Sequence, residues 1–401
     1  MTDDVLDIPF ADAFSFDPSP TWARLREEAP AVRVRTLAGA RVWLVTRYDD
    51  VKLVLADPRF SRAAVVKEGA PRVGVSRPLA GTLPTTDPPE HTRLRGLVSG
   101  AFAHRRVERA REWVRELCEG LADDLAAARA DGVDLRRVFA LPLPIQVICT
   151  LLGVPYDDRE RFREWVELSY SMEMSERERV EEAMASLLEY MGALVAAKRA
   201  EERARERAGE RSADLLDELC ATSLTHDELV AFALNLLVAG HETSANQITG
   251  FVATLLRDRR HWERLVAEPD LVPRAVEELM RFTRLSEVGQ LRVALEDVEV
   301  AGVVVRAGEG VMASIGSANR DPRAFDAPDE LDLARTPNPH LALGAGPHFC
   351  LGAQLARIEL QEALGVLLRR FPGLRAARPV EELAWRRVLV SGLAELPVAL
   401  G

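Results

Sequence analysis

The sequence is poor in cysteine, in long apolar runs and in signals for export. Its 401 residues include four cysteines and no Cys-x-x-Cys pair, which argues against a disulfide framework and the common zinc spacings. No apolar run reaches the roughly 18 residues that a membrane-spanning helix needs. Residues 1–7 are acidic and predict no signal peptide. We therefore expect a cytoplasmic protein without a membrane segment.

Basic residues are outnumbered by acidic ones, 52 to 63, and the formal net charge is −11. A nucleic-acid-binding protein would be expected to present a basic face, so no nucleic-acid partner is predicted. The length exceeds what one compact core usually supports, which predicts either two domains or one large domain with a small lobe.

Helical and strand-like patterns are distributed unevenly along the chain. Nearly everything from residue 105 to residue 220 has helical periodicity. Residues 61–83 contain glycine and proline without a sustained period, and this predicts a long loop of the kind that carries function. The strand-like runs are 31–36, 41–46, 291–293 and 298–305. The first two of these runs flank a short turn and predict a hairpin.

One long helix is predicted in the second half of the chain. Thr225-His226-Asp227-Glu228 matches a capping box, in which the threonine caps the helix and the glutamate reaches back to it. The following residues, Leu229 to about Arg257, contain no proline. They predict a helix of about 30 residues, long enough to cross an entire domain.

The middle of this helix, Ala239-Gly240-His241-Glu242-Thr243-Ser244, has an unusual composition. A glycine inside a helix costs roughly 1 kcal/mol relative to alanine, and a buried acid or hydroxyl without a partner costs more. A glutamate that faces solvent would explain the acid alone. The small side chains at positions 239, 240 and 243 share one face and favour a pocket.

A glycine-rich stretch, residues 343–353, holds Cys350 in a loop before a helical run that begins at Gln354. Free N–H groups and the dipole at a helix start favour a thiolate, and glycine permits close approach to a bulky ligand. Three other interpretations are a buried core cysteine, a zinc ligand and the thiol of a cysteine–histidine pair. A core cysteine needs no flanking glycines, no second cysteine completes a zinc set, and the protease signatures are missing.

Five segments, in this order, resemble the cytochrome P-450 haem-thiolate monooxygenases, and most closely the soluble, actinomycete-like bacterial branch. Each segment alone has little specificity, but all five in order across a chain of the family's length are specific. The segments are Asp87-Pro88-Pro89-Glu90-His91-Thr92-Arg93-Leu94-Arg95, Ala239-Gly240-His241-Glu242-Thr243-Ser244, Glu278-Leu279-Met280-Arg281, Asn319-Arg320-Asp321-Pro322 and Gly344-Ala345-Gly346-Pro347-His348-Phe349-Cys350-Leu351-Gly352.

The resemblance implies the P-450 fold, which is mainly α with a small β lobe and has a long central helix crossing the haem. It implies a single domain over residues 1–401, with the β-rich parts at about 30–60, 285–320 and 380–400. The implied cofactor is haem b, and a monomer is expected.

The same resemblance implies roles for individual residues. Cys350 would be the axial thiolate of the haem iron, which favours cleavage of the O–O bond. Glu242 and Thr243 would deliver protons to iron-bound dioxygen, with Glu242 connecting to solvent. The other implied residues are His91, Arg95, Arg292 and His348 for the two haem propionates, Ala239 and Gly240 for the space above the iron, Gly344 and Gly352 for the loop around the sulfur, and Glu278 and Arg281 for a structural ion pair.

Two positions depart from the family pattern. Leu343 stands seven residues before the cysteine, where the family usually has phenylalanine, so the redox potential of the iron is expected to differ. The segment that usually provides a third partner to the Glu278–Arg281 pair lacks its arginine here. Arg320 and Arg323 are the substitutes that we consider.

The substrate implied by family analogy is a medium-sized, largely hydrophobic secondary metabolite, such as a polyketide, a macrolide or a cyclic peptide. Hydroxylation, epoxidation and oxidative coupling all remain open, since the oxygen chemistry belongs to the cofactor. The pocket residues expected are Asn235, Val238, Leu285, Val288 and Val390.

No flavin or iron–sulfur motif is present, so electrons from NAD(P)H are expected to arrive through a ferredoxin reductase and a ferredoxin. A basic patch for the ferredoxin would form if the arginine-rich segments meet, although scattered solvated arginines are the alternative. The alternative is a haem-thiolate protein used as a sensor or as a non-oxygenase catalyst, although a sensor would not need the Glu242-Thr243 pair. The arginines are at positions 93, 95, 105, 106, 109, 111, 357, 369 and 370.

Overall fold

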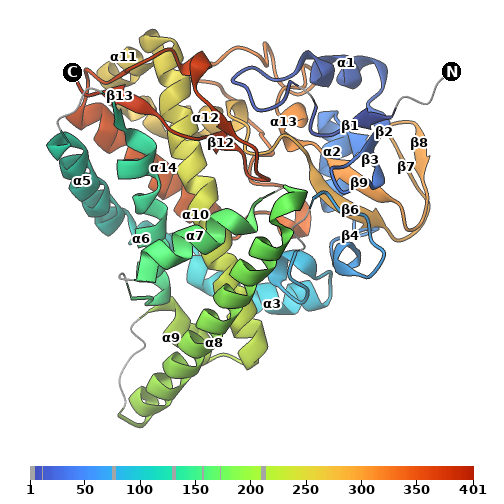
Figure 1. The fold of residues 1–401 in the computed structure, drawn as a ribbon, viewed down its shortest axis with the longest axis horizontal. Coiled ribbons are helices and arrows are strands. Elements are labelled where there is room, and N and C mark those ends of the chain that lie inside the picture. Colours follow the sequence, from blue (N-terminus) through green and yellow to red (C-terminus); the bar gives the residue numbers. More distant parts are fainter. Residues whose placement is uncertain are drawn as a thin grey trace.

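The computed structural model describes residues 5–10, 12–74, 78–128, 132–155, 158–171, 173–208 and 214–401. Helices make up most of the described chain, and the strands β1–β4 and β6–β9 gather in a lobe on the side of the N-terminus (Figure 1). The helices are α1 (Pro20–Glu28), α2 (Tyr48–Ala56), α3 (Glu90–Ser99), α4 (His104–Glu108), α5 (Arg111–Ala127), α6 (Pro142–Leu152), α7 (Arg159–Ser169), α8 (Arg177–Ala208), α9 (Leu215–Cys220), α10 (His226–Arg257), α11 (Arg259–Ala267), α12 (Val272–Phe282), α13 (Ile315–Ala318) and α14 (Ala353–Arg370).

Strands and short turns complete the architecture. The strands are β1 (Leu6–Asp7), β2 (Ala31–Arg35), β3 (Arg41–Val45), β4 (Phe60–Ser61), β5 (Val133–Asp134), β6 (Gln290–Ala294), β7 (Val298–Val300), β8 (Val303–Val305), β9 (Gly310–Ala313), β10 (Arg375–Ala376), β11 (Trp385–Arg386), β12 (Gly392–Leu393) and β13 (Pro397–Ala399). The turns that matter below are the π-helical η4 (Arg136–Ala140) and the 3-10 turns η8 (Gly346–His348) and η9 (Val380–Glu382).

Six strands form the main sheet, in the order β1-β2-β3-β9-β6-β4. The hairpin expected from residues 31–46 is confirmed, because β2 and β3 pair antiparallel with Val34 opposite Val42. The expected strands after residue 290 are confirmed as well: β6 pairs with β9 inside this sheet, and β7 and β8 form a separate hairpin. Strands between residues 380 and 400 pair elsewhere, β11 with β12 and β13 with β10 and β5.

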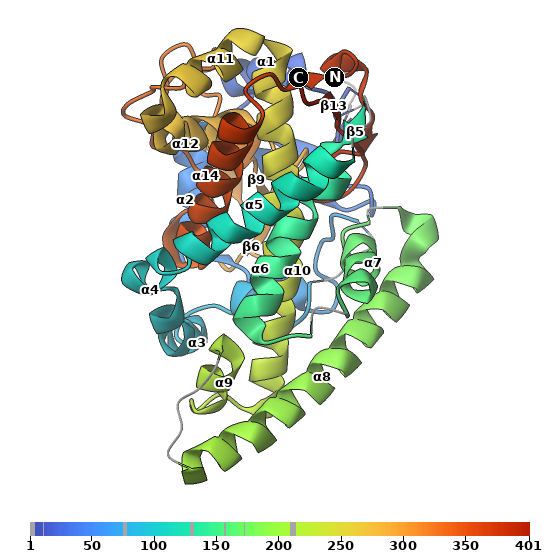
Figure 2. The same cartoon turned by 90° about the vertical axis from the view of Figure 1, so that its left-hand side faces the viewer.

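Helix α10 is the long helix that the sequence predicts. The Thr225 hydroxyl accepts the Glu228 N–H and the Glu228 carboxylate accepts the Thr225 N–H, so the capping box is confirmed. The helix runs through the helical part of the molecule and packs against α6, α8 and α14 (Figures 1 and 2). Most of its side chains between Leu229 and Leu255 are buried, so its polar residues are held inside the protein.

Apolar side chains form one large cluster among the helices and two smaller clusters against the main sheet. Along β3, Val42 and Leu44 belong to one of the sheet clusters and Val45 to the other, as the two-residue period of a strand requires. The sheet is therefore covered on both faces. Among the described residues, no helix is long and apolar enough to cross a membrane.

Candidate active site

The loop before α14 places Cys350 at a defined position. Gly344 and Gly346 have φ of +80° and +69°, which side chains other than glycine rarely adopt. A Cβ on Gly346 would lie 2.5 Å from the Ala56 Cα, so this glycine also lets the loop approach α2. The Cys350 N–H donates to the Leu343 carbonyl at 2.9 Å, and Gly352 is the residue that precedes α14. The loop-then-helix arrangement is thus confirmed.

Burial and the helix start act in opposite directions on the pKa of the Cys350 thiol. Burial raises the pKa of the Cys350 thiol, and the Gly352 N–H, Arg95 and Arg357 offset only part of that effect. In the chain without a bound metal, the loss of hydration thus acts against the favourable contacts at the helix start. A metal bound at the sulfur would favour the thiolate.

Four predicted residues from three elements meet beside this loop. The rings of His91 on α3 and His348 in η8 lie 4.4 Å apart between centroids. Arg95 on α3 donates to the Pro347 carbonyl at 3.2 Å. Arg292 on β6 is buried, and its charge contributes to lowering the pKa of His348. The structure therefore brings together the side chains that the resemblance assigned to one anionic ligand.

This group of residues, His91, Arg95, Arg292 and His348, is called the cation cluster below. Asp87 is the carboxylate that acts on it, and its charge does not restore the ordinary pKa values of His91, Arg292 and His348. Burial lowers the pKa of Arg292 well below its usual range, and burial together with Arg292 and His91 lowers the pKa of His348 to about 3. His91 Nε2 is buried and has no partner among the described residues. Buried cations require anionic partners, so the cluster fits a dianionic ligand such as the two propionates of haem.

Helix α10 presents an accessible face near its middle. Ala239 is exposed although the helix around it is largely buried, and Thr243 is partly exposed one turn later. Gly240 faces α6 instead, because a Cβ there would lie 3.4 Å from Ile148 Cδ1. The Thr243 hydroxyl donates to the Ala239 carbonyl at 2.5 Å. A bulky flat group can therefore approach Ala239 and the Thr243 hydroxyl.

Glu242 points into a buried charged cluster. Its Oε2 accepts from Arg386 Nη1 at 2.7 Å, from Arg136 Nη2 at 3.3 Å and from Asn246 Nδ2 at 3.3 Å. Burial opposes ionisation, but Arg386 and Arg136 together lower the pKa of Glu242. Its Oε1 is buried without a partner among the described residues. Glu242 is therefore an ionised carboxylate with one free oxygen.

Glu278 and Arg281 are completely buried and joined by two hydrogen bonds of 2.7 and 2.8 Å. The third partner is Arg335, whose Nε lies 3.1 Å from each oxygen of Glu278. The two substitutes considered from the sequence were wrong. Arg320 pairs with Asp329, and Arg323 pairs with Glu27 and Asp321.

Three of the five residues expected in the substrate pocket, Val238, Leu285 and Val390, accept hydrogen bonds at their carbonyls. Tyr170, at the end of α7, donates its hydroxyl to the Val238 carbonyl at 2.9 Å. The Val390 carbonyl accepts from Asn246, and the Leu285 carbonyl accepts from the Ser391 N–H.

The other two predicted pocket residues make different contacts. Asn235 is partly exposed, and its amide donates to the Ala231 carbonyl at 2.7 Å on its own helix. Val288 is 2% exposed and packs in the apolar cluster against the sheet.

Sequence reasoning missed Arg62, Arg136, Arg335 and Arg386. Arg62 donates to the Leu291 carbonyl, and burial lowers its pKa to about 10. Its charge also acts on Arg292 and His348. No local pattern marks these arginines, because each is recognised only by partners distant in the chain.

Most arginines of the expected basic patch are paired with acids of the same chain. Six of the nine form ion pairs: those at positions 93, 106, 111, 357, 369 and 370. No ion pair is recorded for Arg95, Arg105 or Arg109 within the described part of the chain. The patch therefore carries less uncompensated positive charge than the sequence alone suggests.

Comparison with known proteins identifies the family. The family model for cytochrome P450 matches residues 24–375. Nocardicin C N-oxygenase of Nocardia uniformis subsp. tsuyamanensis is 49% identical over 402 residues, covering 98% of each chain. Mycinamicin IV hydroxylase/epoxidase of Micromonospora griseorubida is 43% identical and covers 97% of each chain.

A solved structure has the same fold. The cytochrome P450 hydroxylase of the leinamycin biosynthetic pathway of Streptomyces atroolivaceus is 47% identical, with a TM-score of 0.88, and the match covers 98% of this chain and 100% of that one. The chain described here belongs to the cytochrome P450 family of haem-thiolate monooxygenases.

Proposed function

We propose that this monooxygenase binds haem b and uses it to oxidise a medium-sized, largely hydrophobic secondary metabolite in the cytoplasm, acting as a monomer. The observation that supports the cofactor is the cation cluster. It gathers two histidines and two arginines beside the Cys350 loop with little negative charge to balance them. A ligand with a sulfur-binding metal and two carboxylates satisfies both features.

Each residue of the site has a separate proposed role. When bound, haem supplies the activation of dioxygen. Cys350 would hold the iron, and the cation cluster would hold the propionates. The Thr243 hydroxyl, which donates to the Ala239 carbonyl, would provide a hydrogen bond near dioxygen, and the Glu242 carboxylate, with one free oxygen, would receive protons and pass them on.

Electrons reach the enzyme from NAD(P)H through a ferredoxin reductase and a ferredoxin in this proposal. The surface that supports ferredoxin docking is smaller than the basic patch expected from the sequence. Its candidate members are Arg105 and Arg109, which are exposed, and Phe349, which is 39% exposed next to Cys350. Cations attract an acidic partner, and an exposed aromatic side chain is typical of an interface core.

The substrate proposal is a polyketide, macrolide or cyclic peptide, oxidised by hydroxylation, epoxidation or coupling. The named relatives act on nocardicin C and mycinamicin IV, and these names support a tailoring reaction on a preformed natural product. The segments that meet around Tyr170, Val238 and Val390 are mostly apolar with a few hydrogen-bonding groups, which suits such molecules.

Two spectra test the proposal. The purified protein, reduced and exposed to carbon monoxide, is expected to show the strongly red-shifted Soret band of a thiolate-ligated haem, and its absence would refute the cofactor assignment. The ferric protein is then titrated with macrolides and with cyclic peptides. A saturable shift of its Soret band identifies a ligand, and product formation with dioxygen and reduced ferredoxin distinguishes a substrate from an inhibitor.

A further inference from the structure

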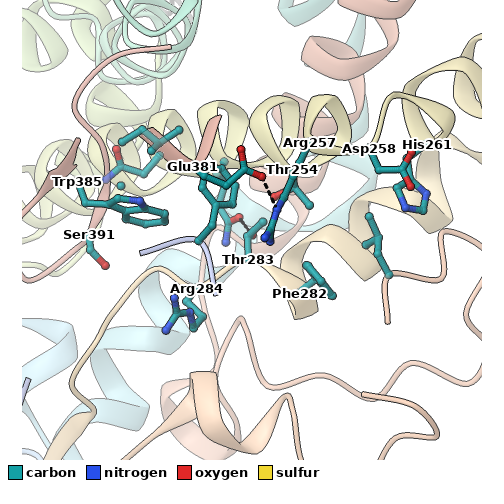
Figure 3. A pocket seen from close by; sticks show the side chains of 17 residues that line it. Thr254, Arg257, Asp258, His261, Phe282, Thr283, Arg284, Glu381, Trp385 and Ser391 are labelled. Carbon is teal, nitrogen blue, oxygen red and sulfur yellow. Dashed lines mark hydrogen bonds and ion pairs between the residues drawn. The ribbon is translucent and has the colours of Figure 1, made fainter. Parts of the chain in front are cut away.

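A cavity of about 370 Å³ lies along the C-terminal half of α10. It is bounded by that helix, the end of α12 and the strands β11 and β12. Figure 3 shows Trp385 and Ser391 at one end and Asp258 and His261 at the other. Among the described residues, its lining includes no member of the cation cluster, of the Cys350 loop or of the five predicted substrate contacts. The cavity is therefore distinct from the haem site and from the predicted substrate pocket.

Polar atoms without a partner occur on the lining. Ser391 lines the cavity and is 1% exposed, and its hydroxyl oxygen has no partner within the described chain. The Gln247 amide uses one of its two polar atoms to hydrogen-bond the Thr283 hydroxyl at 2.6 Å, and no partner is recorded for the other atom among the residues that the structure describes. Buried polar groups without a partner are costly. A ligand with both a hydrogen-bond acceptor and a donor would satisfy them.

The charges of the lining are already compensated. Arg257 forms ion pairs with Asp17 and with Glu381. Burial lowers the pKa of His261, so its ring is uncharged near neutral pH. An ionic ligand would find no uncompensated charge, and burying an unpaired charge is expensive. The cavity therefore favours a neutral molecule. The other ion pairs of the lining are Asp258 with Arg260 and Arg284 with Glu287.

The remaining side chains of the lining are mainly aromatic or apolar. The Phe16 ring meets the Trp385 ring edge-on, with centroids 5.7 Å apart and an angle of 81° between the planes. Aromatic walls with a few polar groups are typical of small-molecule pockets and suit flat rings. The apolar members are Phe16, Phe282, Leu331, Trp385 and Leu393.

The volume limits the size of the ligand. At about 30 Å³ for each water-sized group, the cavity admits on the order of a dozen groups. A whole macrolide or cyclic peptide is larger than this. The cavity therefore does not fit a second molecule of the proposed substrate, and a smaller compound is needed to fill it.

One wall of the cavity is a short hairpin, residues 385–393. Strands β11 and β12 pair only through Trp385 with Leu393 and Arg386 with Gly392. Trp385 lines the cavity, whereas Arg386, the next residue, forms an ion pair with Glu242. Successive side chains of a strand point to opposite faces, so the hairpin separates the cavity from the active-site carboxylate. A two-stranded pairing of this length is marginally stable without further contacts.

We propose that this cavity binds a small, neutral aromatic lactam or secondary amide, and that the bound molecule stabilises the 385–393 hairpin. The Ser391 hydroxyl donates to the carbonyl oxygen of the ligand, the Gln247 amide bonds to the same amide group, and the aromatic part packs against Trp385 and Phe16. The site goes beyond the oxidation given under Proposed function and does not depend on the substrate. Since Arg386 belongs to the hairpin, occupancy couples to the active site.

The probe is 2-quinolone, which is neutral and flat, has a carbonyl beside an N–H, and lacks a basic nitrogen that could bind iron. Calorimetric titration of the haem-loaded full chain is expected to give saturable binding with a dissociation constant below about 1 mM. A crystal structure of the complex is expected to place the lactam against Ser391 and Gln247. Naphthalene, which lacks the lactam, is expected to bind at least about tenfold more weakly.

Two variants change the cavity. Gly250 lines it, and a Cβ there meets Thr283 Cγ2 at an ordinary 3.8 Å, so Gly250→Leu adds bulk at a helix position that tolerates it. We expect this variant to bind 2-quinolone at least about tenfold more weakly. Ser391→Ala is expected to lose about fivefold in affinity, as for one neutral hydrogen bond. Without the ligand, Ser391→Ala should be as stable as the wild type, because the hydroxyl has no partner in the described chain to lose.

Gly120→Leu is the matched control, because Gly120 is an exposed mid-helix glycine of α5 with nothing within 4 Å of its Cβ position. This variant is expected to keep the wild-type affinity for 2-quinolone. Amide hydrogen exchange tests the effect on the hairpin. Exchange across residues 385–393 is expected to slow when 2-quinolone is added to the wild type or to Gly120→Leu, and to stay unchanged in Gly250→Leu.

Three results would each overturn the site: no saturable binding below 1 mM, a complex with 2-quinolone only beside the haem, or wild-type affinity in Gly250→Leu. Equal affinity for naphthalene would refute the lactam class, and unchanged exchange at saturation would refute the effect on the hairpin. If Gly250→Leu does not fold, Ser391→Ala and the crystal structure decide the question. The carbon monoxide spectrum tests the proposed function separately, because none of these measurements requires oxygen activation.

Discussion

Arg335 Nε lies 3.1 Å from each carboxylate oxygen of Glu278, although 57 positions separate the two residues in the chain. Glu278 also pairs with Arg281. The Nη atoms of Arg335 donate hydrogen bonds to the carbonyls of Asp326, Ala327 and Glu330. One guanidinium therefore joins α12 to the loop that leads towards Cys350.

Arg335→Met is expected to destabilise the protein by about 3 kcal/mol, because removing one partner of a buried ion pair leaves the other charge incompletely compensated. Urea unfolding measures the change. Arg323→Met is the control: its side chain is 42% exposed, and its pairs with Glu27 and Asp321 are worth at most about 1 kcal/mol. Equal losses in the two variants would show that Arg335 has no special role.

Thr243→Ala is expected to lower product formed per electron pair by about tenfold while substrate binding stays unchanged. The loss of the hydroxyl at the accessible face of α10 removes a hydrogen-bond donor beside Ala239. Thr249→Ala removes the same kind of bond, from Thr249 Oγ1 to the Ala245 carbonyl at 2.8 Å, but at a buried position. Product formed and reductant consumed are measured in parallel for both variants. We expect the product formed per electron pair to fall in Thr243→Ala and to stay unchanged in Thr249→Ala.

Arg292→Met is expected to weaken haem retention by roughly tenfold without destabilising the haem-free chain. The guanidinium is buried and no carboxylate forms an ion pair with it among the described residues. Hydrogen bonds to the Leu291 carbonyl and Gln290, together with the charge of Asp87, offset only part of its desolvation cost, so the cofactor's anion would offset the rest. Haem transfer to apomyoglobin measures retention, and urea unfolding of the apoprotein measures stability. A loss of both properties would instead indicate a purely structural arginine. Arg41→Met, at an exposed position of β3, should change neither.

Glu359→Gln is expected to flatten the dependence of stability on pH. Burial raises the pKa of Glu359 to about 8, against 4.5 as its ordinary value, and the Ser244 hydroxyl offsets part of this. Between these two values the unfolded chain ionises while the folded chain stays protonated, so wild-type stability falls by up to about 1.4 kcal/mol per pH unit from this group.

The wild type and Glu359→Gln should therefore be similar near pH 4, and the variant should be the more stable near pH 8. Urea unfolding of both proteins across this pH window gives the answer. Parallel stability curves would mean that Glu359 ionises normally in the folded chain.

Leu343→Phe is expected to shift the reduction potential of the bound iron by on the order of tens of millivolts, because packing around an axial ligand tunes the metal. Leu343 is partly buried, and its carbonyl accepts the Cys350 N–H at 2.9 Å, which places this residue beside the ligand's backbone. Potentiometric titration of the two proteins makes the comparison. An identical potential would show that this departure from the family pattern is neutral.

Features set by neighbouring residues could be predicted from the sequence. The capping box at Thr225 and the glycine loop around Cys350 depend on contacts within a few residues, and both have the expected form. Arg136, Arg335 and Arg386 could not be found in this way. Their partners lie 106, 57 and 144 positions away in the chain, and their burial depends on the complete fold.

The pKa of Cys350 could be predicted only in part, for a related reason. A helix start is visible in the sequence, but the hydration lost by Cys350 depends on everything that packs around it. The dipole of the helix start lowers the pKa of this thiol and burial raises it. Only the helix start can be recognised in the sequence.

Arg386 belongs to β11, and the turn that follows it carries Val390, a residue proposed to contact substrate. Transplanting this hairpin from a relative to alter selectivity would therefore also replace a counter-ion of Glu242. Chimeric enzymes and directed-evolution libraries built on residues 385–393 should lose efficiency for reasons unrelated to substrate fit, unless position 386 is kept as arginine.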